Sequence, residues 1–147
     1  MVKDPIEWVE HCVLSSNNRI IGQIEYMVSQ AEFVAKVASG GSVPGLALDL
    51  ATPVEKLDQD VLFKVDVVLV MSVPAGFGGQ EFDLNVWEKI EKIAKIRSEL
   101  NMKFKILVDG GVTKELVDQM KKAGVDEIAV GRRIFEGDLK ENIGLFE

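Results

Sequence analysis

Five short apolar runs, separated by stretches with helical patterning, constrain the fold of this chain more than any other feature. In the middle run every residue from Val67 to Met71 is apolar. A strand with one wet face alternates apolar and polar residues, so an unbroken run indicates a strand buried on both faces, as in parallel sheets. The five runs cover residues 19–26, 45–50, 65–73, 104–108 and 127–130.

Helical patterns lie between these runs. Ile6, Val9 and Val13 fall on one face of a helix that begins at Pro5. The sequence Thr52-Pro53-Val54-Glu55 has the form of a capping box with proline at the first helical position. Other helices are expected over residues 30–38, 84–100 and 113–123, and from about residue 138.

The resulting order is one helix followed by five strand–helix units, which predicts an α/β fold with a parallel sheet. A closed (β/α)8 barrel takes about 200 residues or more, and this chain has 147. An open, doubly wound five-stranded sheet is one arrangement of compatible size. The leading helix, with no strand before it, favours a chain that starts partway through a longer βα array.

Composition excludes several classes of protein. Acids outnumber bases by 24 to 17, giving a formal charge of −7, so the overall field repels nucleic acids. The single cysteine, Cys12, cannot form an internal disulfide and predicts a cytoplasmic location. No apolar stretch approaches the roughly 20 residues of a membrane span. An anionic ligand would therefore be held by local features such as backbone amides.

Three glycine-rich segments follow three successive predicted strands. They are Gly76-Phe77-Gly78-Gly79-Gln80, Asp109-Gly110-Gly111 and Gly131-Arg132. Ligands of parallel α/β folds bind at this edge of the sheet, where glycine allows close approach and exposed N–H groups attract anions. The plainer alternative is that the glycines only make turns. Three such segments at consecutive strand ends favour a phosphate site.

Asp109 is the acid best placed for chemistry, because it ends a strand beside the proposed phosphate loop. A carboxylate there can bind a divalent cation or exchange a proton with a substrate carbon. The alternative is a capping or turn aspartate, which is also the interpretation favoured for Asp49. Gln23 and Glu25 alternate along the first strand, so both are candidates to face the interior of a barrel. The plainer alternative is a polar lining pair whose side chains hydrogen-bond each other.

Arg132 and Arg133 leave two interpretations open as well. Their guanidinium groups can pair with a phosphate. They can equally form salt bridges with Glu136 and Asp138 on the following segment.

The glycine segments carry a resemblance to a known family. Residues 71–82, MSVPAGFGGQEF, closely resemble the sixth-strand signature of the ribulose-phosphate 3-epimerase family. Residues 45–53 resemble its fifth strand, residues 108–112 its seventh, and Val130-Gly131 with Ile134-Phe135 its eighth. Met1-Val2 aligns with the end of its third strand. The resemblance implies a partial (β/α)8 TIM barrel: one domain over residues 1–147, with five parallel βα units preceded by one helix.

Members of this family interconvert D-ribulose 5-phosphate and D-xylulose 5-phosphate at C3. Two aspartates act as acid and base, and a divalent metal (Zn, Fe or Mn) steadies the enediolate. The resemblance implies that Asp109 is both a catalytic residue and a metal ligand. It further assigns substrate phosphate binding to Gly76, Phe77, Gly78, Gly79, Gly110, Gly111, Gly131 and Arg132.

Several departures from the family pattern shape the expected function. The first two strands and most of the third, which carry the second aspartate and the metal-binding histidines, have no counterpart here, so the remaining metal ligands are absent. Gly22-Gln23-Ile24-Glu25 stands where the family has Val-His-x-Glu, and Gly131-Arg132-Arg133 where it has Gly-Ser-Ala. The isolated chain is therefore expected to have negligible epimerase activity.

Two alternatives stay open. One is another phosphosugar enzyme of this barrel type, acting on an allulose- or hexulose-phosphate. The other is a non-catalytic phosphate-binding assembly module. In each case the expected ligand is a small phosphosugar, with no nucleic-acid or membrane partner. Because an unclosed barrel exposes two strand edges, we also expect a homo-oligomer, or a complex with the missing N-terminal strands.

Overall fold

The computed structural model describes residues 2–12 and 18–146, and its centre is one five-stranded parallel sheet with the strands in sequence order. The strands are β1 (Arg19–Gln23), β2 (Val43–Leu48), β3 (Val67–Met71), β4 (Lys105–Asp109) and β5 (Glu127–Ala129). Each strand pairs in parallel with the next. A doubly wound sheet would reverse its strand order at a switch point. The uninterrupted order confirms the partial barrel.

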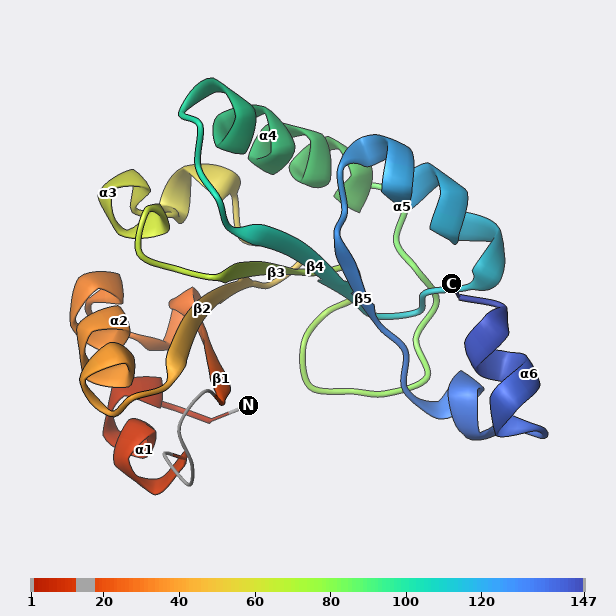
Figure 1. Ribbon diagram of the computed structural model, residues 1–147, viewed down its shortest axis with the longest axis horizontal. Coiled ribbons are helices and arrows are strands. Elements are labelled where there is room, and N and C mark those ends of the chain that lie inside the picture. Colours follow the sequence, from red (N-terminus) through yellow and green to blue (C-terminus); the bar gives the residue numbers. More distant parts are fainter. Residues whose placement is uncertain (1, 13–17, 147) are drawn as a thin grey trace.

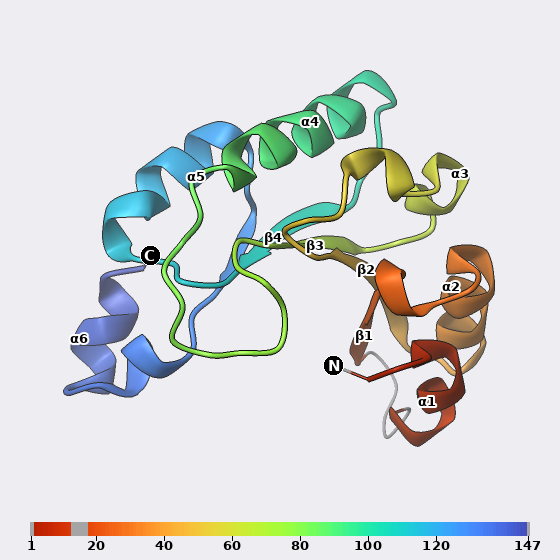
Figure 2. The ribbon, with the colours of Figure 1, turned by 180° about the vertical axis from the view of Figure 1, so that it is seen from behind.

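The helices alternate with these strands. They are α1 (Pro5–Cys12), α2 (Gln30–Ser39), α3 (Gln59–Leu62), α4 (Val86–Glu99), α5 (Val117–Ala123) and α6 (Leu139–Gly144). Figures 1 and 2 show α2, α3, α4 and α5 along the convex side of the curved sheet, with the loop that follows β3 reaching over the opposite, concave side. The concave side corresponds to the interior of a barrel.

Two glycines reveal which residues face each side of the sheet. A Cβ on Gly22 would lie 2.6 Å from the ring of Phe33 on α2, so Gly22 faces the helices. A Cβ on Gly45 would lie 2.5 Å from Val67 and 3.0 Å from Ile21, so these residues share the other face. Because side chains alternate along a strand, the concave face also carries Gln23, Met71 and Asp109.

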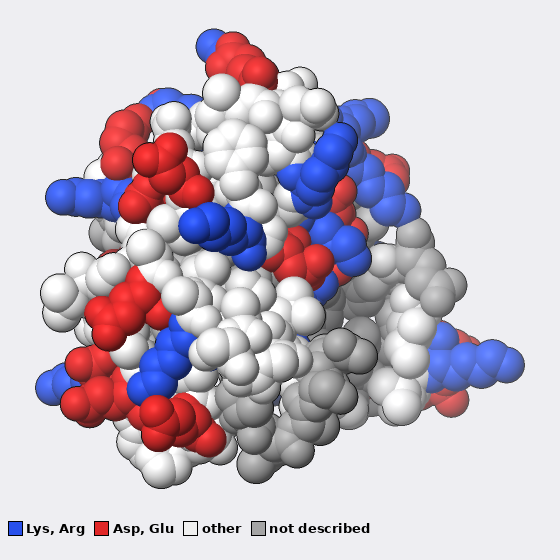
Figure 3. Space-filling model, turned by 60° about the vertical axis from the view of Figure 1, so that its left-hand side comes forward, with Lys and Arg blue, Asp and Glu red and all other residues white. Residues whose placement is uncertain are grey.

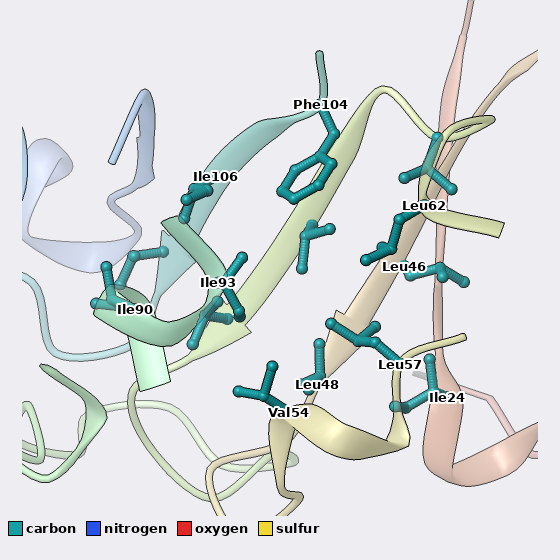
Figure 4. Close-up of a cluster of buried hydrophobic side chains, with 14 of the residues drawn as sticks. Ile24, Leu46, Leu48, Val54, Leu57, Leu62, Ile90, Ile93, Phe104 and Ile106 are labelled. Atoms are coloured by element: carbon teal, nitrogen blue, oxygen red, sulfur yellow. The ribbon is translucent and has the colours of Figure 1, made fainter. Parts of the chain in front are cut away.

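The main core lies between the sheet and the helices. In Figure 4, Ile106 of β4 lies near Ile90 and Ile93 of α4, whereas Leu46 of β2 lies beside Leu62 of α3 and Leu48 of β2 lies beside Leu57. All of these side chains are buried. Burial of each such side chain contributes roughly 1.5–3 kcal/mol, so this layer fixes the curvature that places the strand ends.

Most helices lie where the sequence predicts them, but the capping box at residues 52–55 does not form. Residues Val54–Lys56 make a short 3-10 turn, η2, and Pro53 occupies the capping position, where it has no side-chain oxygen to accept a bond. The α-helix α3 begins only after Asp58, which accepts a hydrogen bond from the Asp60 amide.

Other boundaries agree with expectation more closely. The segment after Thr113 starts as a 3-10 turn, η3 (Lys114–Leu116), and α5 then ends at Gly124 with φ +89°. Helix α6 begins after Asp138, which caps it. Met1, aligned with a third strand, and Val13, expected on the face of the first helix, both lie outside the described residues.

The surface carries mixed charge. On the side that Figure 3 shows, acidic and basic side chains are interspersed, with no continuous area of one sign. Over the ranges that the structure describes, no helix is long and apolar enough to cross a membrane. The side shown in Figure 3 therefore offers no broad positive area to an anion.

Candidate functional site

The three glycine-rich turns converge on one hollow of about 630 Å³ at the carboxyl ends of β3, β4 and β5. The residues that the sequence proposes as catalytic or phosphate-binding all line it: Gly76, Phe77, Gly78, Gly79, Asp109, Gly110, Gly111, Gly131 and Arg132. Their roles remain predictions, but their convergence is a property of the fold. The lining also includes Gln80 and Arg133, for which sequence reasoning had no settled role.

The turn after β4 packs tightly against the loop after β3. Gly110 and Gly111 have φ values of +119° and +58°, which side-chain-bearing residues rarely adopt. A Cβ on Gly111 would lie 2.3 Å from the backbone nitrogen of Phe82, and one on Gly110 would lie 2.6 Å from Val73. Glycine is thus required at both positions for the two segments to meet.

Three of the other glycines that line the hollow have open space beside them. No described atom lies within 4 Å of where a Cβ would stand on Gly76, Gly78 or Gly131. Their backbone is therefore accessible to a ligand from the hollow. Where no side chain fills this space, a phosphate can come close enough to contact backbone N–H groups.

Ser72 joins the ends of β3 and β4. Its hydroxyl, fully buried, donates to the carbonyl oxygens of Asp109 at 2.9 Å and Gly110 at 2.5 Å. Sequence reasoning did not single Ser72 out. The available signal was a hydroxyl at the end of the most apolar run in the chain, where a buried polar group must find a partner.

The loop after β3 is held by hydrogen bonds within the loop and by one from the turn after β2. Gln80 donates from Nε2 to the carbonyl oxygens of Pro74 and Phe77, both at 2.8 Å. The carboxylate of Asp49 accepts from the Leu50 amide in its own turn and from the Ala75 amide at 3.0 Å. Asp49 is therefore more than a turn residue, because it links the end of β2 to the glycine loop.

Gln23 and Glu25 do not form the expected pair. Glu25 lies in a 3-10 turn, η1 (Ile24–Tyr26), which ends the alternation of the strand, and its carboxylate accepts the Asp49 amide at 2.8 Å. Gln23 is 8% exposed, and neither polar atom of its side chain has a partner within the described chain. The strand ends at Gln23, two residues before Glu25, so its alternation of side chains does not extend to Glu25.

Asp109 is the last residue of β4, and its carboxyl group is the acidic group on the lining of the hollow. Burial raises its pKa above the ordinary value for aspartate, and a hydrogen bond with the Gly110 backbone opposes that rise. A raised pKa brings a carboxyl group closer to the range in which it can both accept and release a proton.

The lining residues do not by themselves fit a metal. Asp109 offers one oxygen ligand, and the described residues contain no group of three or more His, Cys, Asp or Glu side chains arranged to hold an ion. A divalent cation takes several such ligands. Any metal bound at Asp109 would need ligands from outside these residues.

Comparison with known proteins agrees with this geometry. The model of the ribulose-phosphate 3 epimerase family matches residues 1–135. The ribulose-phosphate 3-epimerase of Treponema pallidum is 31% identical over 95% of this chain and 64% of its own length. The Escherichia coli K12 enzyme of that name is 35% identical over 68% of this chain and 44% of its own, and the Mycobacterium bovis enzyme 26% identical over 94% and 60%.

The chain thus spans between about two fifths and two thirds of the length of these relatives. The match nevertheless covers almost all of the chain itself, including the three glycine turns that line the hollow. The chain belongs to the ribulose-phosphate 3-epimerase family.

Proposed function

We propose that this chain is a ribulose-phosphate 3-epimerase homologue that binds a pentose 5-phosphate in the hollow, with Asp109 beside C3. The observation that carries this proposal is the convergence of three glycine turns and one carboxylate on a single hollow. In the complete reaction, D-ribulose 5-phosphate and D-xylulose 5-phosphate interconvert by loss and return of the C3 proton.

The phosphate would lie among the glycine turns. Gly76, Gly78 and Gly131 line the hollow with open space beside them, so that their backbone N–H groups would contact the phosphate, and Arg132 supplies a positive charge. A phosphate ester binds well to such a set, because amide donors and a guanidinium group offer several charge-assisted hydrogen bonds at once. This recognition needs no positive field over the whole acidic chain.

Asp109 would carry the proton transfer. Its carboxylate takes the proton from C3, and the electrons of the C3–H bond move into the C2–C3 bond as the C2 carbonyl oxygen gains negative charge. Return of the proton to the same face regenerates the substrate. Return to the opposite face gives the epimer and needs a second acid, which the described lining does not contain.

The family implies a divalent metal, which would stabilise negative charge on the enediolate oxygens. Asp109 is the residue of this chain that would contact it. Because the described residues do not complete a metal site, we derive no step through a metal. The proposal for the isolated chain is therefore binding and slow proton exchange at C3, with negligible epimerisation.

The test measures exchange and epimerisation separately. The purified chain is incubated with D-ribulose 5-phosphate in D2O, deuterium at C3 is followed by NMR, and D-xylulose 5-phosphate is measured by a coupled assay. We expect exchange above the uncatalysed rate and almost no epimer. Asp109→Asn should abolish the exchange, whereas Asp118→Asn, the same change on the exposed face of α5, should not.

Ordinary turnover by the isolated chain would overturn the predicted loss of epimerase activity. Equal exchange by wild type and Asp109→Asn would overturn the role of Asp109. A panel of pentulose, allulose and hexulose phosphates would separate the substrates that this barrel type accommodates.

A non-catalytic phosphate-binding module is the second candidate, favoured by the single acidic side chain on the described lining. It predicts thermal stabilisation by phosphate, no dependence on added metal, and no deuterium exchange at C3. The same exchange experiment therefore decides between the two functions.

A further inference from the structure

The two arginines that follow β5 are held in different ways. Arg133 donates from Nη1 to the carbonyl oxygens of Gly111 at 2.9 Å and Val112 at 2.7 Å. These carbonyls belong to the turn after β4. Arg133 therefore fastens the 3-10 turn η4 (Arg132–Phe135) to that turn, and its guanidinium group is engaged by the backbone of the chain itself.

Arg132 has no such anchor to the turns of the hollow. Its guanidinium lies 3.6–3.9 Å from the position that a Cβ on Gly79 would take, so it reaches the glycine loop after β3. Its Nε lies 3.2 Å from Oε1 of Glu136, and the two side chains are 75% and 62% exposed. Arg132 thus lines the hollow while its charge is paired with an acid on its own turn.

This pairing is the kind that a ligand can displace. Ion pairs between exposed side chains are weak, because water screens them and both side chains lose freedom. A phosphate offers a guanidinium group two parallel charge-assisted hydrogen bonds. Among the described residues of the lining, the basic side chains are Arg132 and Arg133, and Arg133 is already bound to carbonyls.

We infer that Glu136 competes with the phosphate for Arg132. Glu136 pairs with Arg132 beside Gly79, and when a phosphate monoester binds, the guanidinium group passes from this carboxylate to the phosphate. Arg133 keeps η4 in place during the exchange. This inference rests on the phosphate site of the proposed function and adds a residue, Glu136, that lowers its affinity.

The first experiment compares two charge-matched variants. Inorganic phosphate is titrated into the purified chain at low ionic strength by calorimetry, with the backbone amide signals of Gly79 and Gly110 followed by NMR. Glu136→Gln should tighten binding about two- to fivefold, the range expected from release of an exposed ion pair. Glu88→Gln removes the same charge and breaks a similar pair with Lys92, 2.9 Å long, on α4, and should leave affinity nearly unchanged.

The second experiment closes a double-mutant cycle. Arg132→Gln should weaken phosphate binding about tenfold, since it removes a charged hydrogen-bond donor. In that background Glu136→Gln should have no further effect, because no guanidinium group is left to release. Circular dichroism and a thermal melt of each variant verify that the fold is kept.

The results separate this inference from the proposed function. If phosphate shifts the glycine amides but Glu136→Gln behaves like Glu88→Gln, or acts equally without Arg132, the competition is wrong and the phosphate site stands. If phosphate leaves these amides unmoved in the wild-type chain, both the site and the competition are wrong.

Discussion

Arg19 at the start of β1 and Glu127 at the start of β5 form an ion pair, with Nη1 and Oε2 2.5 Å apart, although 108 positions separate them in the sequence. Arg19 also contacts Asp66 at 2.6 Å, and Lys105 contacts Glu127 at 2.8 Å. The first and last strands of the sheet are thus bridged across the concave face. The bridge lies at the amino ends of the strands, opposite to the hollow.

This network predicts a loss of stability in acid. Its two cations lower the pKa of Glu127 from 4.5 to about 2, chiefly through hydrogen bonds from Arg19 and Lys105. A carboxyl group with a depressed folded-state pKa stabilises the fold above its unfolded pKa, and this contribution disappears as the pH falls from about 4.5 towards 2. Urea unfolding at pH 6 and pH 3 should show that Glu127→Gln costs about 1 kcal/mol at pH 6, after allowance for solvent screening.

At pH 3 the same substitution should reduce the free energy of unfolding by much less, because the wild-type carboxylate contributes less to stability there. Glu88→Gln, which removes an exposed carboxylate on α4, provides the comparison. Because Glu88 forms an exposed ion pair with Lys92, a pH dependence equal to that of Glu88→Gln would show that the bridge between β1 and β5 stabilises the fold no more than an exposed pair within one helix.

Gly111→Ala should destabilise the chain by about 1–3 kcal/mol. The added methyl group would meet the Phe82 backbone at 2.3 Å and would occupy a residue with φ +58°, so the loop after β3 must move. Gly78→Ala, where no described atom lies within 4 Å of the new group, should change unfolding free energy by less than about 0.5 kcal/mol. Equal effects in urea unfolding would contradict the packing between these two turns.

Ser72→Ala should cost about 1–2 kcal/mol, because the carbonyl oxygens of Asp109 and Gly110 lose the buried hydroxyl that bonds them. Ser39→Ala is the matched change at an exposed helix end, where the Ser39 hydroxyl donates to the backbone carbonyl oxygen of Lys36 at 2.9 Å. Chemical denaturation of both variants provides the measurement. A smaller loss for Ser72→Ala than for Ser39→Ala would mean that the bridge between β3 and β4 is unimportant.

The purified chain should associate in solution. The concave face leaves Ile21, Leu69 and Leu107 only partly buried, and β1 and β5 have no further strand beside them in the described sheet. Unpaired edges and apolar surface favour association with a second copy or with strands that complete a barrel. Sedimentation velocity over a range of concentrations tests this, and a folded monomer at the highest concentration would contradict it.

The strands and their parallel order were predictable from the sequence, because a short unbroken run of apolar residues is a local pattern that indicates a strand buried on both faces. In β3, Val67 and Val68 are both fully buried although they point to opposite sides, as the unbroken apolar run predicts, whereas Leu69 on the concave face is only partly buried. The glycine turns could be placed at one edge since all parallel strands end on the same side. Because β3, β4 and β5 are neighbours in the sheet, the turns that follow them were expected to lie together.

The contacts that hold the hollow together were not predictable in the same way. Glu25 follows a strand that ends at Gln23, and no local pattern indicates that its carboxylate accepts the Asp49 amide. The link from Asp49 to Ala75 joins residues 26 positions apart. Such bonds depend on how neighbouring βα units sit side by side, which propensity and periodicity do not encode.

The described lining of the hollow comes entirely from residues 71–133. The segments before β3 therefore support the glycine loop of the hollow through Asp49, although none of their residues belongs to the described lining. A change in that first half would therefore alter the support of the glycine loop after β3, while the residues that line the hollow stay the same.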